Sequence, residues 1–162
     1  ASCRSVISVR RLSTASDSPM SPFHSTINMR LGFFLRALGR AYLAFCEPAQ
    51  VDTYVRQAIA DAAEGHKLAR DTESLCQMIA SIRWKGYALR DKDIEPRSSD
   101  TIAVPIFLDG AVRATLGVTF FRSAMRCEAA ISDLATMLKE ASAEITRETE
   151  RLRARSELEI FG

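Results

Sequence analysis

Residues 101–120 read TIAVPIFLDGAVRATLGVTF and contain the most informative pattern in the chain. Its two halves, Thr101–Phe107 and Val112–Phe120, are rich in the β-branched and aromatic residues that strands favour. Between them stands Asp109-Gly110, a pair typical of the tight turn of a β-hairpin. Pro105 has no backbone N–H to donate, which indicates an edge or a bulged position in the first strand. The stretch therefore predicts two antiparallel strands.

Side chains alternate between the two faces of a strand, and here the alternation separates bulky residues from small ones. The bulky positions are Ile102, Val104, Ile106, Leu116, Val118 and Phe120, and the small ones are Thr101, Ala103, Thr115, Gly117 and Thr119. We expect the bulky face to pack into a core. The small face has two interpretations. It is either an ordinary sheet face backed by solvent, or the floor of a ligand pocket in which Gly117 leaves volume and threonine hydroxyls orient a polar group.

The segment before the hairpin predicts strands followed by helices. Residues 5–10 are typical of a strand, 13–22 of a loop, and 23–33 alternate with the period of two of a second strand. Apolar residues then recur at helical spacing in three stretches. These stretches run from Leu38 to Phe45, from Pro48 to Ala62, and from a cap at Asp71 or Thr72 to Gly86. Residues 87–100 are polar and predict a loop.

A long helix is predicted after the hairpin. Its apolar positions step by three and four, at Ile131, Leu134, Leu138, Ala141 and Ile145, and Leu152 continues the same side. Strands and helices are thus segregated along the chain, and the strands include an antiparallel hairpin. This order predicts an α+β fold and not a βαβ fold.

Composition excludes several classes of protein. The net charge of +2 is too small to indicate a nucleic-acid or membrane partner, and no apolar run is long enough to span a bilayer. The four cysteines, at positions 3, 46, 76 and 127, are scattered, as reduced thiols of a cytosolic protein are. No metal or cofactor is expected, since the only histidines, His24 and His66, are far apart. Asp91, Asp93 and Glu95 lack the rest of a calcium loop and are interpreted as solvated charge.

No motif for catalysis or DNA binding stands out. The chain has no nucleophile elbow, phosphate-binding glycine loop or zinc-protease helix, so it is predicted not to be an enzyme. Cys46, Cys76 and Cys127 fall in predicted helices, where a small buried apolar residue is the simplest interpretation. The arginines after residue 146 alternate with glutamates, which favours a salt-bridged helix over a phosphate-binding surface.

Three segments resemble the effector-binding domain of bacterial transcription regulators of the isocitrate-lyase-regulator (IclR) type. Residues 39–44, GRAYLA, are similar to a helix start of that domain, and residues 82–88, IRWKGYA, to its Ile-Arg-x-x-Gly-Tyr segment. Residues 101–107, TIAVPIF, and 114–119, ATLGVT, resemble its paired strands. The three segments follow in family order, and the likeness runs from about Val6 to Ile145.

The resemblance implies a GAF-like fold, an antiparallel sheet flanked by helices, with a pocket for a small organic acid. The matching pocket positions are Met20, Phe23, Leu31, Ala37, Leu38, Arg90, Ser99, Thr101, Gly117 and Thr119. Family members that bind small oxoacids tend to carry an acid where this chain has Arg90, and serines at Gly117 and Thr119. Arg90 could instead clamp a carboxylate, and the additional phenylalanines could enclose an aromatic ring, so aromatic acids are among the candidates.

The resemblance also sets the expected organisation. Residues 1–162 are interpreted as one effector-binding and oligomerisation domain of a cytoplasmic regulator. Its opening helix and first strand, and the preceding DNA-binding winged helix-turn-helix, are expected to be missing from the chain. DNA would then be bound only through that absent domain, and the partners are the effector and further copies in a homodimer or homotetramer. The alternatives are a GAF-type sensor of another signalling protein, an enzyme of the same shape, and a purely structural association module.

Overall fold

A four-stranded antiparallel sheet is the centre of the molecule. The computed structural model describes residues 6–11, 32–60, 66–125 and 127–161. The strand order is β1-β4-β3-β2. The strands are β1 (Val6–Arg11), β2 (Ala88–Leu89), β3 (Ser99–Leu108) and β4 (Ala111–Phe121). The predicted hairpin is confirmed as β3 and β4, and Asp109 and Gly110 supply the left-handed turn with φ of 54° and 73°.

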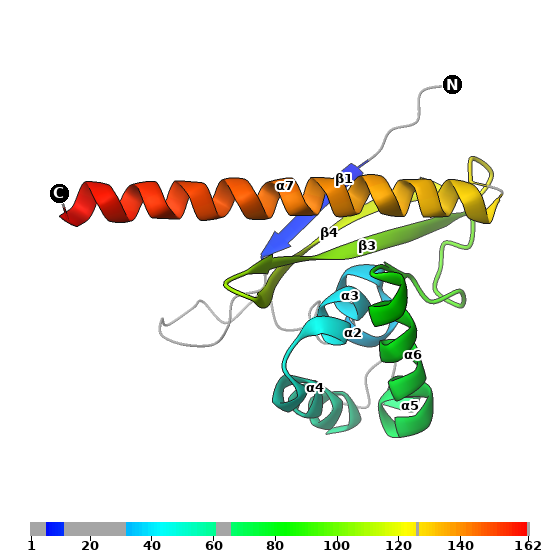
Figure 1. Cartoon of the computed structure of the whole chain (residues 1–162). Coiled ribbons are helices and arrows are strands. Elements are labelled where there is room, and N and C mark those ends of the chain that lie inside the picture. The colour runs from blue at the N-terminus through cyan, green and yellow to red at the C-terminus, as the bar shows by residue number, and fades with distance from the viewer. Residues whose placement is uncertain (1–5, 12–31, 61–65, 126, 162) are drawn as a thin grey trace.

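The bulky face of the hairpin packs against one long helix, α7 (Glu128–Phe161), which crosses the sheet in Figure 1. The buried residues of this layer are Ile102, Val104, Ile106, Leu116, Phe120, Ala135 and Leu138. The predicted seam is wrong at Ala141, which is exposed, because Ser142 faces the sheet and donates to the Pro105 carbonyl at 2.6 Å. Leu152 is 55% exposed, since α7 extends past the end of the sheet (Figure 1).

Pro105 lies where β3 has a hydrogen-bonding neighbour on one side only. The edge strand β2 pairs with Ile102 and Ala103 and ends before reaching Pro105. A register shift follows between Ile106 and Phe107. The sequence prediction of an edge or bulged position is thus confirmed. No strand lies beside Pro105 on the β2 side, so its missing N–H costs no hydrogen bond of the sheet.

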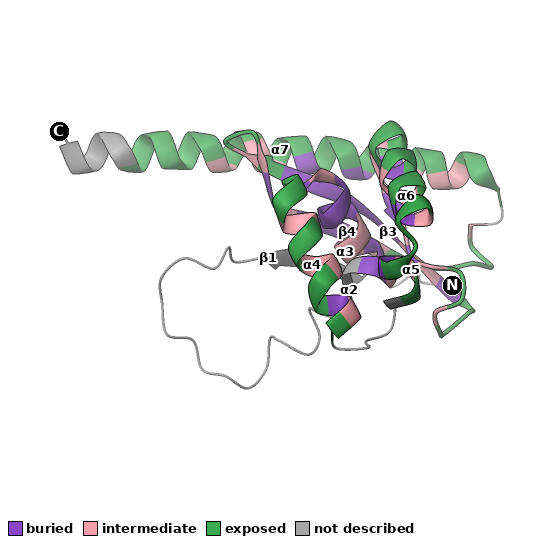
Figure 2. Cartoon of the chain, turned by 90° about the horizontal axis from the view of Figure 1, so that it is seen from below, coloured by how far each residue is buried: buried purple, intermediate pink, exposed green. Residues whose placement is uncertain are grey.

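The small face of the hairpin packs against a second helix, α3 (Ala37–Phe45). This layer is built of small side chains, with Ala37, Ala41, Ala44, Ala88, Ala103 and Ile82 buried together. In Figure 2, which looks at the molecule from below, α3 lies directly against the sheet and behind the other helices. The volume expected beside Gly117 is occupied, because a Cβ there would lie 2.9 Å from Leu38 Cδ2 and 3.0 Å from the Ile102 carbonyl oxygen. Small residues on this face therefore let a helix approach closely.

Four further helices surround α3 on the side away from the sheet. They are α2 (Gly32–Leu35), α4 (Pro48–Ala60), α5 (His66–Arg70) and α6 (Thr72–Lys85). Both predicted ends of α6 are confirmed, since Asp71 Oδ1 accepts the Ser74 N–H at 3.1 Å and Gly86 is left-handed with φ of 74°. The short α5 was not predicted.

The predicted strand at 23–33 is wrong at its end, because residues 32–35 form α2. Phe34 of that helix is 1% exposed and packs with Tyr42 and Leu43, so tertiary packing overrides the local period of two. The rest of this predicted strand and Ala62 lie outside the described residues.

We predict that Gly117→Ala destabilises the chain by about 1–3 kcal/mol, the usual cost of overpacking. The added Cβ would meet the flexible end of Leu38 and a backbone carbonyl that cannot move away. Urea denaturation of Gly117→Ala, Leu38→Ala and the double variant measures the coupling. The double variant should be more stable than the sum of the single losses, and strict additivity would contradict close packing at this point.

Candidate functional site

One end of the small face carries a row of polar residues across three strands. The register pairs Thr101 of β3 with Thr119 of β4, and the Arg90 N–H, just after β2, donates to the Thr101 carbonyl at 3.0 Å. Ala88 pairs with Ala103, so Arg90, two residues on, shares their face. We call Arg90, Thr101 and Thr119 the polar row. It lies one step beyond Ala103 and Gly117, the pair that α3 covers.

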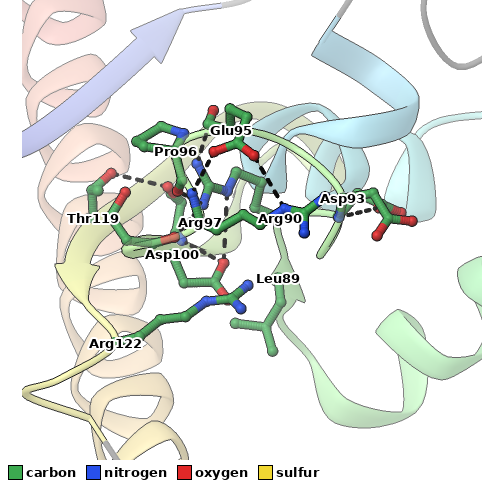
Figure 3. A network of polar contacts seen from close by, with 12 residues as sticks. Leu89, Arg90, Asp93, Glu95, Pro96, Arg97, Asp100, Thr119 and Arg122 are labelled. Atoms are coloured by element: carbon green, nitrogen blue, oxygen red, sulfur yellow. Dashed lines mark hydrogen bonds and ion pairs between the residues drawn. The ribbon is translucent and has the colours of Figure 1, made fainter.

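The two threonines of the polar row form a hydroxyl pair. Their Oγ1 atoms lie 3.0 Å apart, and Figure 3 shows this contact next to the loop that precedes β3. Thr119 is exposed and Thr101 half-buried, whereas Gly117 is buried. The row thus begins where the cover of α3 ends.

Arg90 is the buried cation of the row, with 7% of its surface exposed. Its Nη2 donates to the carbonyls of Pro96, at 2.8 Å, and of Ser99, and its Nη1 to the carbonyl of Glu95, at 3.5 Å. The guanidinium therefore holds the 95–99 loop against the start of β3 (Figure 3). Fixed in this way, it cannot swing out toward solvent without releasing several carbonyls at once.

Asp100 lies between two arginines in this network. Its Oδ1 is 3.9 Å from Arg90 Nε, and its Oδ2 is 3.3 Å from Arg122 Nη2 (Figure 3). The same carboxylate accepts the Thr101 N–H at 2.8 Å. This end of the sheet therefore has two guanidinium groups for one carboxylate, an excess of positive charge beside the hydroxyl pair.

Two buried polar atoms on the small face have no hydrogen-bond partner among the described residues. They are Arg90 Nε and Thr115 Oγ1. Thr115 is 1% exposed and shares its face with Gly117 and Thr119, two and four residues on. Buried polar groups are nearly always paired, so this face has unused capacity for a ligand or for ordered water.

The structure brings together the predicted site residues that it describes. Arg90, Thr101 and Thr119 form the polar row, Ser99 is buried beside it, and Leu38 of α3 covers Gly117. Ala37 begins α3, whose N-cap residue Arg36 supplies no side-chain hydrogen bond. Met20, Phe23 and Leu31 lie outside the described residues.

Sequence reasoning missed Arg40, which fastens β2 from its outer side. Its Nε donates to the Phe34 carbonyl at 2.7 Å, its Nη1 to the Leu89 carbonyl at 3.2 Å, and its Nη2 to Asp91 Oδ2 at 2.6 Å. Burial lowers the pKa of Arg40, and the neighbouring Asp91 carboxylate opposes that shift. The signal was present, because Arg40 belongs to the GRAYLA segment that carries the family resemblance.

The acidic loop and the cysteines supply no chemistry in the described part of the chain. Asp91 pairs with Arg40 and Glu95 with Arg97, and no cluster of metal-ligating side chains occurs among the described residues. Cys46 is buried, which raises the pKa of its thiol to about 11 and keeps it neutral at pH 7. The expectation of burial is wrong for Cys76 and Cys127, which are exposed. No described helix is long and apolar enough to cross a membrane.

A family model decides the classification. The family described as bacterial transcriptional regulator IclR C-terminal matches residues 4–147. The chain belongs to the IclR family. This confirms the likeness drawn from the hairpin and the two helical segments. IclR-family domains belong to transcription regulators and are not enzymes, in agreement with the sequence prediction. Comparison with curated proteins by sequence gives no match.

Solved structures of IclR-family and related regulators share the fold. The C-terminal domain of the E. coli regulator KdgR has a TM-score of 0.57 and 22% identity, over 71% of this chain and 69% of that one. A transcriptional regulator from Rhodococcus sp. RHA1 has a TM-score of 0.63 and 20% identity, over 91% and 63%. The repressor BlcR from Agobacterium tumefaciens has a TM-score of 0.53 and 18% identity, over 74% and 46%. This chain therefore spans less than two thirds of the last two, and the predicted GAF-like α+β fold is confirmed.

We predict that Arg90→Gln lowers the free energy of unfolding by about 3 kcal/mol, because it leaves buried carbonyls without their cationic donor and Asp100 with only one of its two arginines. The matched control is Arg97→Gln in the same loop, whose ion pair with Glu95 is 71% and 73% exposed. That change should cost no more than about 0.5 kcal/mol. Equal losses in the two variants, measured by urea denaturation, would contradict the structural role of Arg90.

Proposed function

We propose that this chain is the effector-sensing domain of a cytoplasmic transcription regulator, and that its effector is an organic acid bound at the polar row. DNA would be bound by a separate domain of the regulator. Effector binding would change DNA affinity through the coupling of the two sites. The observation that carries the proposal is the polar row itself, a hydroxyl pair at the open end of a packed face, beside a buried arginine.

The charges and donors around the polar row suit a carboxylate. Arg90 Nε is buried without a hydrogen-bond partner among the described residues, and Arg122 is 42% exposed at the same carboxylate, Asp100. An acid could accept from the hydroxyls of Thr101 and Thr119 and share the charge of these arginines. The first turn of α3 lies beside Gly117, and helix N-termini also favour anions.

Aromatic acids are the finer proposal within this class. Leu38 over Gly117 supplies an apolar wall next to the polar row, and Phe121, two residues after Thr119 on β4, lies on the same face. Phe121 is 59% exposed. A ligand with a carboxylate at one end and an apolar ring at the other would match both kinds of surface.

We predict that some organic acid raises the melting temperature of the chain, and that Thr119→Val reduces this rise. At a hundredfold excess over the dissociation constant the gain is about 2.7 kcal/mol, which corresponds to roughly 5 °C or more. Thr119 is exposed, so the valine should cost little stability. A thermal-shift screen of aliphatic and aromatic acids identifies the ligand, and the same screen on Thr119→Val tests the site.

The control for that screen is Thr136→Val, an equal change at an exposed position of α7. Its ligand-induced rise should equal that of the unmodified chain. A rise that persists unchanged in Thr119→Val would place the acid elsewhere. If no acid stabilises the chain, a purely structural association module becomes the better interpretation.

Self-association is the second part of the proposal. Large apolar side chains remain exposed on the described surface, among them Trp84 at 85% and Met137 at 65%. Symmetric pairing of one such surface is the commonest way to cover it. We predict a mass of at least twice 17.9 kDa in sedimentation at about 50 μM protein, a concentration at which even modest interfaces form. A single species of 17.9 kDa would contradict this.

A further inference from the structure

An open groove lies at the outer edge of the sheet, away from the polar row. It has a volume of about 150 Å³ between α6, α3 and β2. Its apolar lining is Met78 and Ile82 of α6 with Tyr87 and Leu89, and its cationic lining is Arg40 and Lys85. None of Arg90, Thr101 and Thr119 lines the groove, and Thr119 lies on β4, two strands away from β2. The groove and the polar row are thus separate sites.

We infer that this groove binds a small aromatic monocarboxylate, which goes beyond the effector site proposed above. The size fits, because a cavity of about 150 Å³ takes one benzene ring. The lining fits as well, since four apolar side chains form the wall and polar contacts are few.

The charge around the groove selects an anion. Arg40 is already paired with Asp91 at 2.6 Å, whereas Lys85 has no ion-pair partner among the described residues. Lys139 adds a third cation, with its Nζ 5.7 Å from the centre of the Tyr87 ring and 2.6 Å from the Lys85 carbonyl oxygen. Three cations therefore lie at or beside the groove, and Lys85 is the lining cation left to meet a ligand.

The walls of the groove are held in place before any ligand arrives. Lys139 fixes the Tyr87 ring and the end of α6, and it fits there because residue 86 is glycine: a Cβ at Gly86 would lie 3.0 Å from Lys139 Cε. Arg40 fixes the opposite side through the Leu89 carbonyl. A preformed site of this kind loses little freedom when it binds.

Benzoate is the probe, and its neutral isostere benzamide tests the charge. With the chain labelled at its methionine methyl groups, benzoate should shift the NMR signal of Met78 and leave that of Met137, which lies on α7 and is 65% exposed. Benzamide should bind at least about fivefold more weakly, the effect of losing one exposed ion pair. Trp84 is the chain's one tryptophan, next to Lys85 and 85% exposed, and its fluorescence gives an independent readout.

Three variants separate the groove from other sites. Lys85→Gln should raise the dissociation constant for benzoate about fivefold, and Lys67→Gln, the same change on α5, should leave it unaltered. Ser81→Phe adds a ring at an exposed lining position and should abolish the Met78 shift. Thr119→Val, in the polar row, should leave that shift intact.

The inference is overturned if benzoate does not shift the Met78 signal, or if Lys85→Gln and Ser81→Phe bind benzoate as the unmodified chain does. It is also overturned if Thr119→Val alone removes the binding, since benzoate would then occupy only the polar row. Failure of the groove in these experiments leaves the effector site untouched, because that site is tested by the melting temperature of Thr119→Val with its own acid.

Discussion

The fold depends on how closely α3 lies against the sheet. Three of its alanines, Ala37, Ala41 and Ala44, face Ala88 and Ala103, and Gly117 has no room for even one more carbon. Each small residue contributes fewer apolar contacts than a large one would. Together, however, the small residues let the backbone of α3 lie close to the sheet, and this close packing excludes water. The bulky face does not require small residues, because leucine and isoleucine side chains of α7 fill the space against it.

The same packing sets the position of the candidate site, which lies where the cover of α3 ends. Leu38 of α3 covers the sheet over Gly117, and one step further along the strands lie Thr101 and Thr119. A threonine under α3 would bury a hydroxyl, as Thr115 does without a described partner. At the margin of the cover, hydroxyls are reached by solvent and cost little. The residues of the polar row therefore lie at the point where α3 no longer covers the sheet.

Periodicity and turn chemistry predicted the elements whose local signals agree with their packing. The hairpin and α6 each carry a strong local signal, the Asp109-Gly110 turn and the caps at Asp71 and Gly86, and both were found. The end of the predicted strand at 23–33 is wrong because Phe34 is buried against Tyr42, a tertiary contact that the local alternation does not reveal. Ala141 was misplaced for a similar reason. The apolar spacing of α7 allows the helix to face the sheet with Ala141 or with Ser142. The hydrogen bond from the Ser142 hydroxyl to the Pro105 carbonyl fixes Ser142 on the buried face.

The candidate site was predictable as a set of residues but not as an arrangement. Alternation put Gly117 and Thr119 on one face, and the family likeness added Arg90 and Thr101. Neither could show that Leu38 fills the space beside Gly117, because that depends on how far α3 is from the sheet. Nor could they reveal the role of Arg90. Its partners are backbone carbonyls, which every residue has, so the sequence does not show which of them it binds.

Strand β2 lies at the edge of the sheet, beside both the groove and Arg90 of the polar row. It has only two residues, too few for its ladder bonds to Ile102 and Ala103 to hold it alone. Arg40 donates to the Leu89 carbonyl at its outer edge, and Arg90, the next residue after the strand, donates its N–H to the Thr101 carbonyl of β3. The two arginines also secure the loop after it, Arg40 through Asp91 and Arg90 through the Pro96 carbonyl. Strand β2 therefore depends on these two arginines as well as on its short ladder, so the loss of either guanidinium would loosen the same strand.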